Sequence, residues 1–320
     1  MNPKAESGKN RNLSNHTLHV QLGSICCAVK CHNEELLDRL THLYSDFPAL
    51  QEPDITLEVK TVENMSLTEF ETALPKLTFS HDGDFFTTTH SLASGKRNLN
   101  AGTVSIEAET LFLDHDSGRG YINEALCAVY FTACKLKYNG VPPAFIVHSC
   151  GILHHDQVLL FAGPSGTGKS TVARFCDMEY GQVLNDEALL LYRPHRDSNT
   201  LMVEGIPIIG ELPKRLNITA PLRVVLLLKQ GRNTSLRRLD RMEAYVRFMR
   251  QIANPAFIGQ MDKRAVYSLI TDFSSEVTEI TPFYELEFTL DQISLLEVLK
   301  ELEASLDKEG RNDGKPDNQG

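Results

Sequence analysis

The chain has 320 residues and a formal net charge of −10, and 42% of its residues are hydrophobic and 23% charged, which is the balance of a soluble globular protein. The negative charge argues against broad affinity for nucleic acid or for an anionic membrane, because both present negative groups to the protein. No apolar run reaches the roughly 20 residues that a membrane helix requires, and residues 1–15 contain no apolar signal segment. We therefore predict a cytoplasmic protein with no nucleic-acid partner and no membrane partner.

The cysteines are odd in number and scattered among apolar neighbours, which favours reduced, mostly buried thiols. Cys26, Cys27 and Cys31 could instead form a metal site with His32. Two adjacent cysteines cannot easily direct both sulfurs at one ion, and no second cluster follows, so we favour buried strand residues. The seven cysteines are Cys26, Cys27, Cys31, Cys127, Cys134, Cys150 and Cys176.

The first part of the chain favours strands. Residues 1–15 are polar and predicted to be disordered, and residues 16–139 are predicted to form a strand-rich α+β region. A capped run with apolar residues at helical spacing predicts one helix over residues 33–44. Alternating and β-branched residues predict strands at 17–29, 55–59, 85–89 and 103–106, with turns at 82–84 and 94–96.

The pattern then changes to alternating strands and helices. An apolar face predicts a helix over residues 122–138, and we place a domain boundary next to it, so that residues 140–306 form a second domain. The alternation predicts an α/β layer fold with a mostly buried sheet. Its strands are expected at 144–147, 158–162, 183–192 and 224–228, and its helices from Lys169, at 242–251 and at 291–306. Residues 307–320 are polar and predicted to be a disordered tail.

A glycine-rich run after the expected strand 158–162 matches the pattern G-x-x-x-x-G-K-[ST] at every fixed position. Its glycines allow backbone N–H groups to turn toward phosphate oxygens, and the following helix directs its positive end to the same place. Lys169 can reach the β- and γ-phosphates, and the Ser170 hydroxyl can bind Mg²⁺. The predicted nucleotide-binding residues are Gly163, Pro164, Ser165, Gly166, Thr167, Gly168, Lys169, Ser170 and Thr171.

The alternative is a glycine-rich turn without a ligand. Four fixed positions arise by chance in roughly one chain in a hundred of this size, and the apolar strand before the motif and the helix after it lower that frequency further. We therefore predict that the chain binds a nucleotide, ATP with Mg²⁺. The motif says little about the reaction.

Candidate acids follow another expected strand end. Phosphoryl transfer needs a carboxylate for the metal and one to orient the attacking hydroxyl, and Asp186 and Glu187 come directly after an apolar run. A solvated turn with surface acids is the alternative. His148 ends the expected strand 144–147, where it could lie near the γ-phosphate or be only a hydrogen-bonded structural residue.

With these motifs in place, residues 140–300 resemble the catalytic domain of HPr serine kinases, in particular the divergent HPr-kinase-like proteins of peptide-maturation cassettes such as the SynChlorMet type. The family has a histidine fifteen positions before the first loop glycine, as His148 is here. It has an acidic pair that begins sixteen positions after the loop serine, as Asp186 does after Ser170. Further similar runs are the Gly/Pro-rich segment 205–210 and the segment 220–231.

The resemblance implies a phosphoenolpyruvate-carboxykinase-like P-loop kinase domain that transfers the γ-phosphoryl group of ATP to a serine or threonine hydroxyl. Lys169 would hold the phosphates, Ser170 and Asp186 the metal, and Glu187 would accept the hydroxyl proton, although the two acids could exchange roles. Two departures concern a glutamate in place of the family's catalytic aspartate and the lack of a clean Glu-x-Arg-Gly element. Glu204 or Glu211 is the substitute expected for the second metal ligand.

Three functions stay open at this point. A protein or peptide kinase, with a ribosomal precursor peptide as one acceptor, is the leading hypothesis. A small-molecule kinase uses the same phosphate loop, and a nucleotide-binding scaffold would present a peptide to other enzymes without phosphorylating it. The strand-rich first half weakly favours a polypeptide partner, because strand edges pair with extended peptides. The chain could also form a homo-oligomer.

Overall fold

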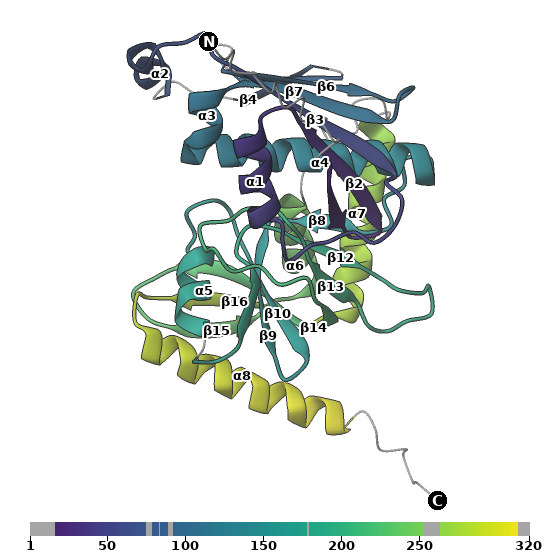
Figure 1. Ribbon diagram of the computed structural model, residues 1–320. Coiled ribbons are helices and arrows are strands. Elements are labelled where there is room, and N and C mark those ends of the chain that lie inside the picture. The colour runs from purple at the N-terminus through teal and green to yellow at the C-terminus, as the bar shows by residue number, and fades with distance from the viewer. Residues whose placement is uncertain are drawn as a thin grey trace, which may run out of the picture.

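The computed structural model describes residues 17–74, 79–82, 84–88, 92–177, 179–252 and 263–312, and both expected disordered ends lie largely outside this part. It is a mixed α/β structure with two sheets, one built from each half of the described chain (Figure 1). The first sheet has seven strands in the order β1-β2-β3-β7-β6-β5-β4. Their bounds are β1 Thr17–Leu22, β2 Ile25–Cys31, β3 Ile55–Val62, β4 Phe79–Asp82, β5 Phe85–Thr88, β6 Ala93–Asn98 and β7 Thr103–Glu109.

The helix α4 (Asp116–Tyr138) lies beneath this sheet, between it and the second half of the chain (Figure 1). Its residues from Ala125 to Cys134 are almost all buried, as expected for a helix with apolar contacts on both sides. The Tyr130 hydroxyl donates a hydrogen bond of 2.7 Å to the Ala144 carbonyl, which ties α4 to the start of the second half. The described part of the first half also contains three shorter helices: α1 (Glu34–Leu43), α2 (Leu67–Ala73) and α3 (Thr110–Asp114).

The second sheet has nine strands, with β11-β9-β10-β14-β13-β12-β8 in order and β16 joining β14 and β15. Its long strand β14 is parallel to both β10 and β16. The strands are β8 Phe145–Val147, β9 Ser149–His154, β10 Gln157–Ala162, β11 Gln182–Asn185, β12 Leu189–Tyr192, β13 Met202–Gly205, β14 Thr219–Gln230, β15 Ser235–Arg238 and β16 Phe283–Phe288.

Two apolar cores hold the sheet in place. The helices α5 (Lys169–Cys176) and α8 (Gln292–Asn312) bury Val172, Leu295 and Leu299 with strand residues on one side. The larger core on the other side continues without a break through α4 to the first sheet. It also contains apolar residues of α6 (Arg241–Phe248) and α7 (Lys263–Ile280), and the short helix η3 (Met249–Gln251) follows α6.

Several expected boundaries are wrong. The turn expected at 94–96 lies inside β6, where Gly95 lacks a side chain because the Phe86 ring occupies that space: an added Cβ would lie 2.1 Å from Phe86 Cζ. The single strand expected over 183–192 is two strands, β11 and β12, separated by the turn that carries the acids. The helix expected from residue 122 begins at Asp116, and the one expected to end at residue 306 continues to Asn312.

The three clustered cysteines lie on β2, with Cys26 and Cys27 buried and all three thiols free. Burial raises the pKa of the Cys27 thiol to about 12. These residues therefore pack in the first sheet, as the sequence analysis favours. Among the described helices none is long and apolar enough to cross a membrane.

Glu124 on α4 gives the structure a predictable pH dependence. Burial raises the pKa of this carboxyl to about 7 from an unfolded value near 4.5. The folded state therefore holds the proton more tightly, and the stability it contributes is present below pH 4.5 and lost as pH rises through about 7. Glutamine cannot ionise. We therefore expect the decrease in the free energy of unfolding between pH 5 and 8 to be about 1–3 kcal/mol smaller in Glu124→Gln than in the parent. Urea denaturation across this range measures the effect, and parallel pH profiles for both proteins would contradict it.

Candidate active site

The predicted site residues meet because of how the second sheet is connected. The strands β10 and β11 are both antiparallel to β9 and therefore parallel to each other, so their carboxyl ends lie at the same edge. The β9 strand begins at that edge, with Ser149 opposite Ala162. Consequently His148, the glycine loop (residues 163–168) and the turn that holds Asp186 and Glu187 all emerge from one edge of the sheet.

The glycine loop joins β10 to α5, and α5 begins at Lys169 as the motif predicts. Gly168 precedes the helix with a φ of 102°, in the left-handed region that favours glycine. An added Cβ there would also lie 2.5 Å from Phe288 Cζ. No side chain caps the N-terminus of α5, so its first N–H groups are not used by a cap and are suited to an anion.

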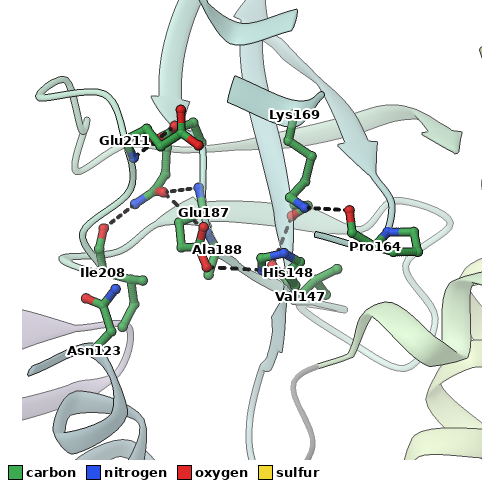
Figure 2. Close-up of polar contacts among 12 residues, drawn as sticks. Asn123, Val147, His148, Pro164, Lys169, Glu187, Ala188, Ile208 and Glu211 are labelled. Atoms are coloured by element: carbon green, nitrogen blue, oxygen red, sulfur yellow. Dashed lines mark hydrogen bonds and ion pairs between the residues drawn. The ribbon is translucent and has the colours of Figure 1, made fainter. Parts of the chain in front are cut away.

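Lys169 is 6% exposed, and its ammonium group lies over the glycine loop (Figure 2). Its Nζ donates hydrogen bonds to the Gly163 carbonyl at 2.9 Å and the Pro164 carbonyl at 3.3 Å. Burial lowers the pKa of Lys169, while the nearby carboxylates of Glu187 and Asp186 oppose this shift. The acids therefore lie close enough to act on the lysine electrostatically.

Asp186 is 1% exposed and receives several hydrogen bonds. The backbone N–H groups of Glu211 and Leu212 donate to its carboxylate at 3.2 Å and 3.3 Å. Burial raises the pKa of Asp186, and hydrogen bonds from the Ser170 hydroxyl and these N–H groups partly offset the shift. The serine and the acid that are both expected to bind the metal therefore lie near each other.

Glu187 and His148 form a second pair at the same edge. His148 Nδ1 lies 3.3 Å from Glu187 Oε1, and both side chains are partly exposed (Figure 2). The backbone holds them together as well, since the Ser149 N–H donates to the Glu187 carbonyl at 3.1 Å. The Glu187 side chain therefore lies against His148 and is partly exposed to solvent. The Asp186 carboxylate is instead buried and hydrogen-bonded to backbone N–H groups.

The oxygen ligands available here suit Mg²⁺. Ser170 supplies a hydroxyl and Asp186 a carboxylate, the hard donors that this ion prefers. Among the described residues no group of three or more His, Cys, Asp or Glu side chains could hold a metal by itself. Such a sparse set fits an ion that keeps waters and shares its remaining positions with phosphate oxygens. The residues therefore fit Mg²⁺ bound together with a nucleotide.

Of the two expected substitutes for the second metal ligand, Glu211 contacts a residue of the site. Its backbone N–H binds Asp186, and its exposed side chain forms an ion pair of 2.7 Å with Arg174. Glu204 lies on β13 between β12 and β14, opposite Leu190 and Thr219. Glu204 stays an untested alternative for the second metal ligand.

The sequence analysis missed the residues that fix the acidic turn. Asn185 is fully buried, and its Oδ1 accepts hydrogen bonds from the N–H groups of Glu187 at 2.7 Å and Ala188 at 3.2 Å. Its Nδ2 donates to the carbonyls of Ile206 and Ile208. A polar residue at the end of the apolar strand β11 was the available signal.

A cavity of about 430 Å³ lies beside the glycine loop, a volume suited to a small ligand. Gln230 at the end of β14 donates a hydrogen bond of 2.7 Å to the Gly166 carbonyl and so links this wall to the loop. Its exposed lining is more apolar than polar, and the cationic Lys229 and Arg247 are in ion pairs with Glu287 and Glu285. The side chains beyond the loop that line it include Lys229, Gln230, Arg247, Arg250 and Gln251.

Comparisons with known proteins add little to this geometry. No protein-family model matches the chain, and no curated protein matches it. Among solved structures, the HPr(Ser) kinase/phosphatase from Coxiella burnetii aligns with 51% of this chain and 98% of its own, at 11% sequence identity and a TM-score of 0.29. A likeness of this size does not assign the chain to a family.

Gly210 tests the placement of Asp186. A Cβ at this position would lie 1.9 Å from Asp186 Oδ1, so Gly210→Ala must displace either the carboxylate or the backbone that holds it. We expect a loss of about 1–3 kcal/mol in the free energy of unfolding and weaker Mg²⁺-dependent nucleotide binding. Chemical denaturation and calorimetric titration measure the two effects. Unchanged Mg²⁺ dependence would show that the carboxylate can move freely.

Proposed function

We propose that the chain binds ATP with Mg²⁺ at this edge and transfers the γ-phosphoryl group to a serine or threonine hydroxyl of a protein or peptide. The observation that carries the proposal is the convergence at one sheet edge of buried Lys169, buried Asp186 near Ser170, and Glu187 beside His148. A glycine-rich turn without a ligand gives no reason for Lys169 and Asp186 both to be buried at one sheet edge, within electrostatic range of each other. Burying charged groups is costly unless they are paired or used.

Each residue has a distinct role in this proposal. Lys169 binds the β- and γ-phosphates, and Ser170 with Asp186 holds the ion. Mg²⁺, when bound, neutralises charge on the phosphate oxygens. Glu187 accepts the proton of the attacking hydroxyl, whose oxygen forms a bond to the γ-phosphorus as the bond to the ADP oxygen breaks. His148 orients the Glu187 carboxylate and stabilises its charge.

The accessibility of the two acids supports this assignment of their roles. Asp186 is buried and accepts hydrogen bonds from backbone N–H groups, which suits a fixed metal ligand. Glu187 is partly exposed, so that a hydroxyl group of the acceptor can reach its carboxylate. A polypeptide acceptor is favoured because this side of the site is open. A precursor peptide of a maturation cassette is one such acceptor.

Glu187→Gln tests the transfer step. We expect the labelling of a library of serine- and threonine-containing peptides by γ-³²P-ATP to fall about 100- to 10,000-fold, the contribution of a general base. The affinity for ATP with Mg²⁺ should change little, because Glu187 does not touch the phosphates in this proposal. The matched control is Glu58→Gln, an exposed glutamate of the first sheet.

The outcomes separate the alternatives. Labelling that persists in Glu187→Gln excludes this residue as the base. A parent protein that binds ATP but labels no peptide points to a scaffold, and one that consumes ATP only with a metabolite points to a small-molecule kinase.

A further inference from the structure

Asn123 on α4 reaches from the first half of the chain to the loop beside the acids (Figure 2). Its Nδ2 donates to the Ile209 carbonyl at 2.7 Å, and its Oδ1 accepts from the Ile209 N–H at 2.8 Å. Both polar ends of the amide are therefore used on the backbone of one residue. Such a paired contact fixes the orientation of that peptide segment, as a strand partner would.

Ile209 is followed directly by the backbone that holds Asp186. Gly210 comes next, where an added Cβ would collide with Asp186 Oδ1, and the N–H groups of Glu211 and Leu212 then donate to the carboxylate. On the other side of Ile209, the Ile208 carbonyl is held by Asn185. The position of residue 209 thus sets where the donors of residues 211 and 212 point.

The helix that carries Asn123 is well suited to fix that position. The neighbouring residues Tyr121, Ala125 and Leu126 are fully buried, so α4 cannot shift without disturbing the core shared with the first sheet. Arg215 provides a second link between this loop and the first half of the chain, because its guanidinium donates to the carbonyls of Pro207 and Leu43. The loop 206–212 is therefore held from both halves of the chain.

We propose that Asn123 is a positioning residue for the metal-binding acid: through the backbone of residues 209–212 it holds the Asp186 carboxylate in the orientation that Mg²⁺ requires. The first half of the chain is then part of the catalytic unit. The role in Mg²⁺ binding rests on the proposed function. The hydrogen bonds between Asn123 and Ile209 do not depend on a bound nucleotide.

The test compares Asn123→Ala and Asn123→Asp with Tyr130→Phe. Asn123→Asp keeps the shape and the acceptor for the Ile209 N–H but loses the donor, so it preserves the packing of α4 if Asn123→Ala does not fold well. Tyr130→Phe removes a different hydrogen bond between the same helix and the second half of the chain, at Ala144. It therefore controls for a general loosening of this contact.

Two measurements are made on each full-length protein. Hydrogen exchange at the amides of Glu211 and Leu212 is expected to become about 10-fold faster or more in both Asn123 variants and to stay unchanged in Tyr130→Phe. ATP affinity is measured by calorimetric titration at increasing Mg²⁺ concentrations. In the Asn123 variants, the Mg²⁺ concentration that gives half of the maximal increase in ATP affinity is expected to be about 5- to 20-fold higher than in the parent. Their affinity for ATP without Mg²⁺ should match that of the parent.

Equal exchange rates at residues 211–212 in all four proteins would overturn the inference. So would an equal loss of ATP affinity with and without Mg²⁺, since that would indicate general damage to the site. If the parent binds no ATP, the proposed function fails, and the exchange measurement still decides whether Asn123 holds the donors of Asp186.

Discussion

Replacing Lys169 with methionine is expected to weaken ATP binding about 10- to 100-fold, since a hydrogen bond to a charged group contributes about 1.5–3 kcal/mol. Methionine is unbranched and of similar length, so it can fill the same buried space. Without ligand, Lys169→Met should be as stable as the parent or more so, because it removes a buried ammonium whose pKa burial lowers. Calorimetric titration with ATP and thermal unfolding with and without ATP measure both effects.

The opposite signs of these two effects make the test specific. A damaged fold would lower both stability and affinity, whereas a phosphate-binding lysine lowers only affinity. Lys60→Met is the matched control, an exposed lysine of β3 that pairs with Glu107 at the surface. If Lys169→Met binds ATP as tightly as the parent, Lys169 does not contribute to ATP binding.

Replacing Asp186 with asparagine is expected to lower phosphoryl transfer by on the order of 100- to 1,000-fold, the usual effect of removing a charged group that stabilises the transition state. Asparagine keeps the shape and one acceptor oxygen for the N–H groups of Glu211 and Leu212. It loses the charge that Mg²⁺ requires. The dependence of ATP binding on Mg²⁺ should therefore largely disappear, while binding without Mg²⁺ persists.

Asp186→Asn should also change how stability depends on pH. Burial raises the pKa of this carboxyl above its unfolded value of 3.8, so the folded parent holds the proton more tightly. The stability that this group contributes is present below pH 3.8 and is lost as pH rises through the folded pKa. The variant should lack this loss. Retained Mg²⁺ dependence together with an unchanged pH profile would show that another residue binds the ion.

The local features of the site could be predicted from the sequence because they depend on nearby residues. The strand–loop–helix arrangement around Lys169 follows from an apolar run, glycines and a helical pattern. Asp186 and Glu187 follow a strand end, as expected, although the expected strand ran on through them. Apolar residues lie on both sides of the acids, and the buried Asn185, which accepts hydrogen bonds from the N–H groups of Glu187 and Ala188, helps to hold the turn between the two strands.

The long-range contacts could not be predicted from one sequence. Asn123 is one of several polar residues of α4, and nothing in the pattern indicates that its partner is Ile209, 86 residues away. Arg215 likewise reads as a surface charge, yet it is 7% exposed and donates to Leu43 in the first half. Such contacts depend on how the two sheets pack through α4, which local periodicity does not specify.

A structure of the chain with a non-hydrolysable ATP analogue and Mg²⁺ tests the central claim most directly. We predict that Lys169 Nζ leaves the carbonyls of Gly163 and Pro164 to contact the β- and γ-phosphates, with Mg²⁺ between Ser170 and Asp186. Glu187 should face the γ-phosphate. Phosphates bound away from Lys169, or an ion that neither Ser170 nor Asp186 contacts, would contradict the claim.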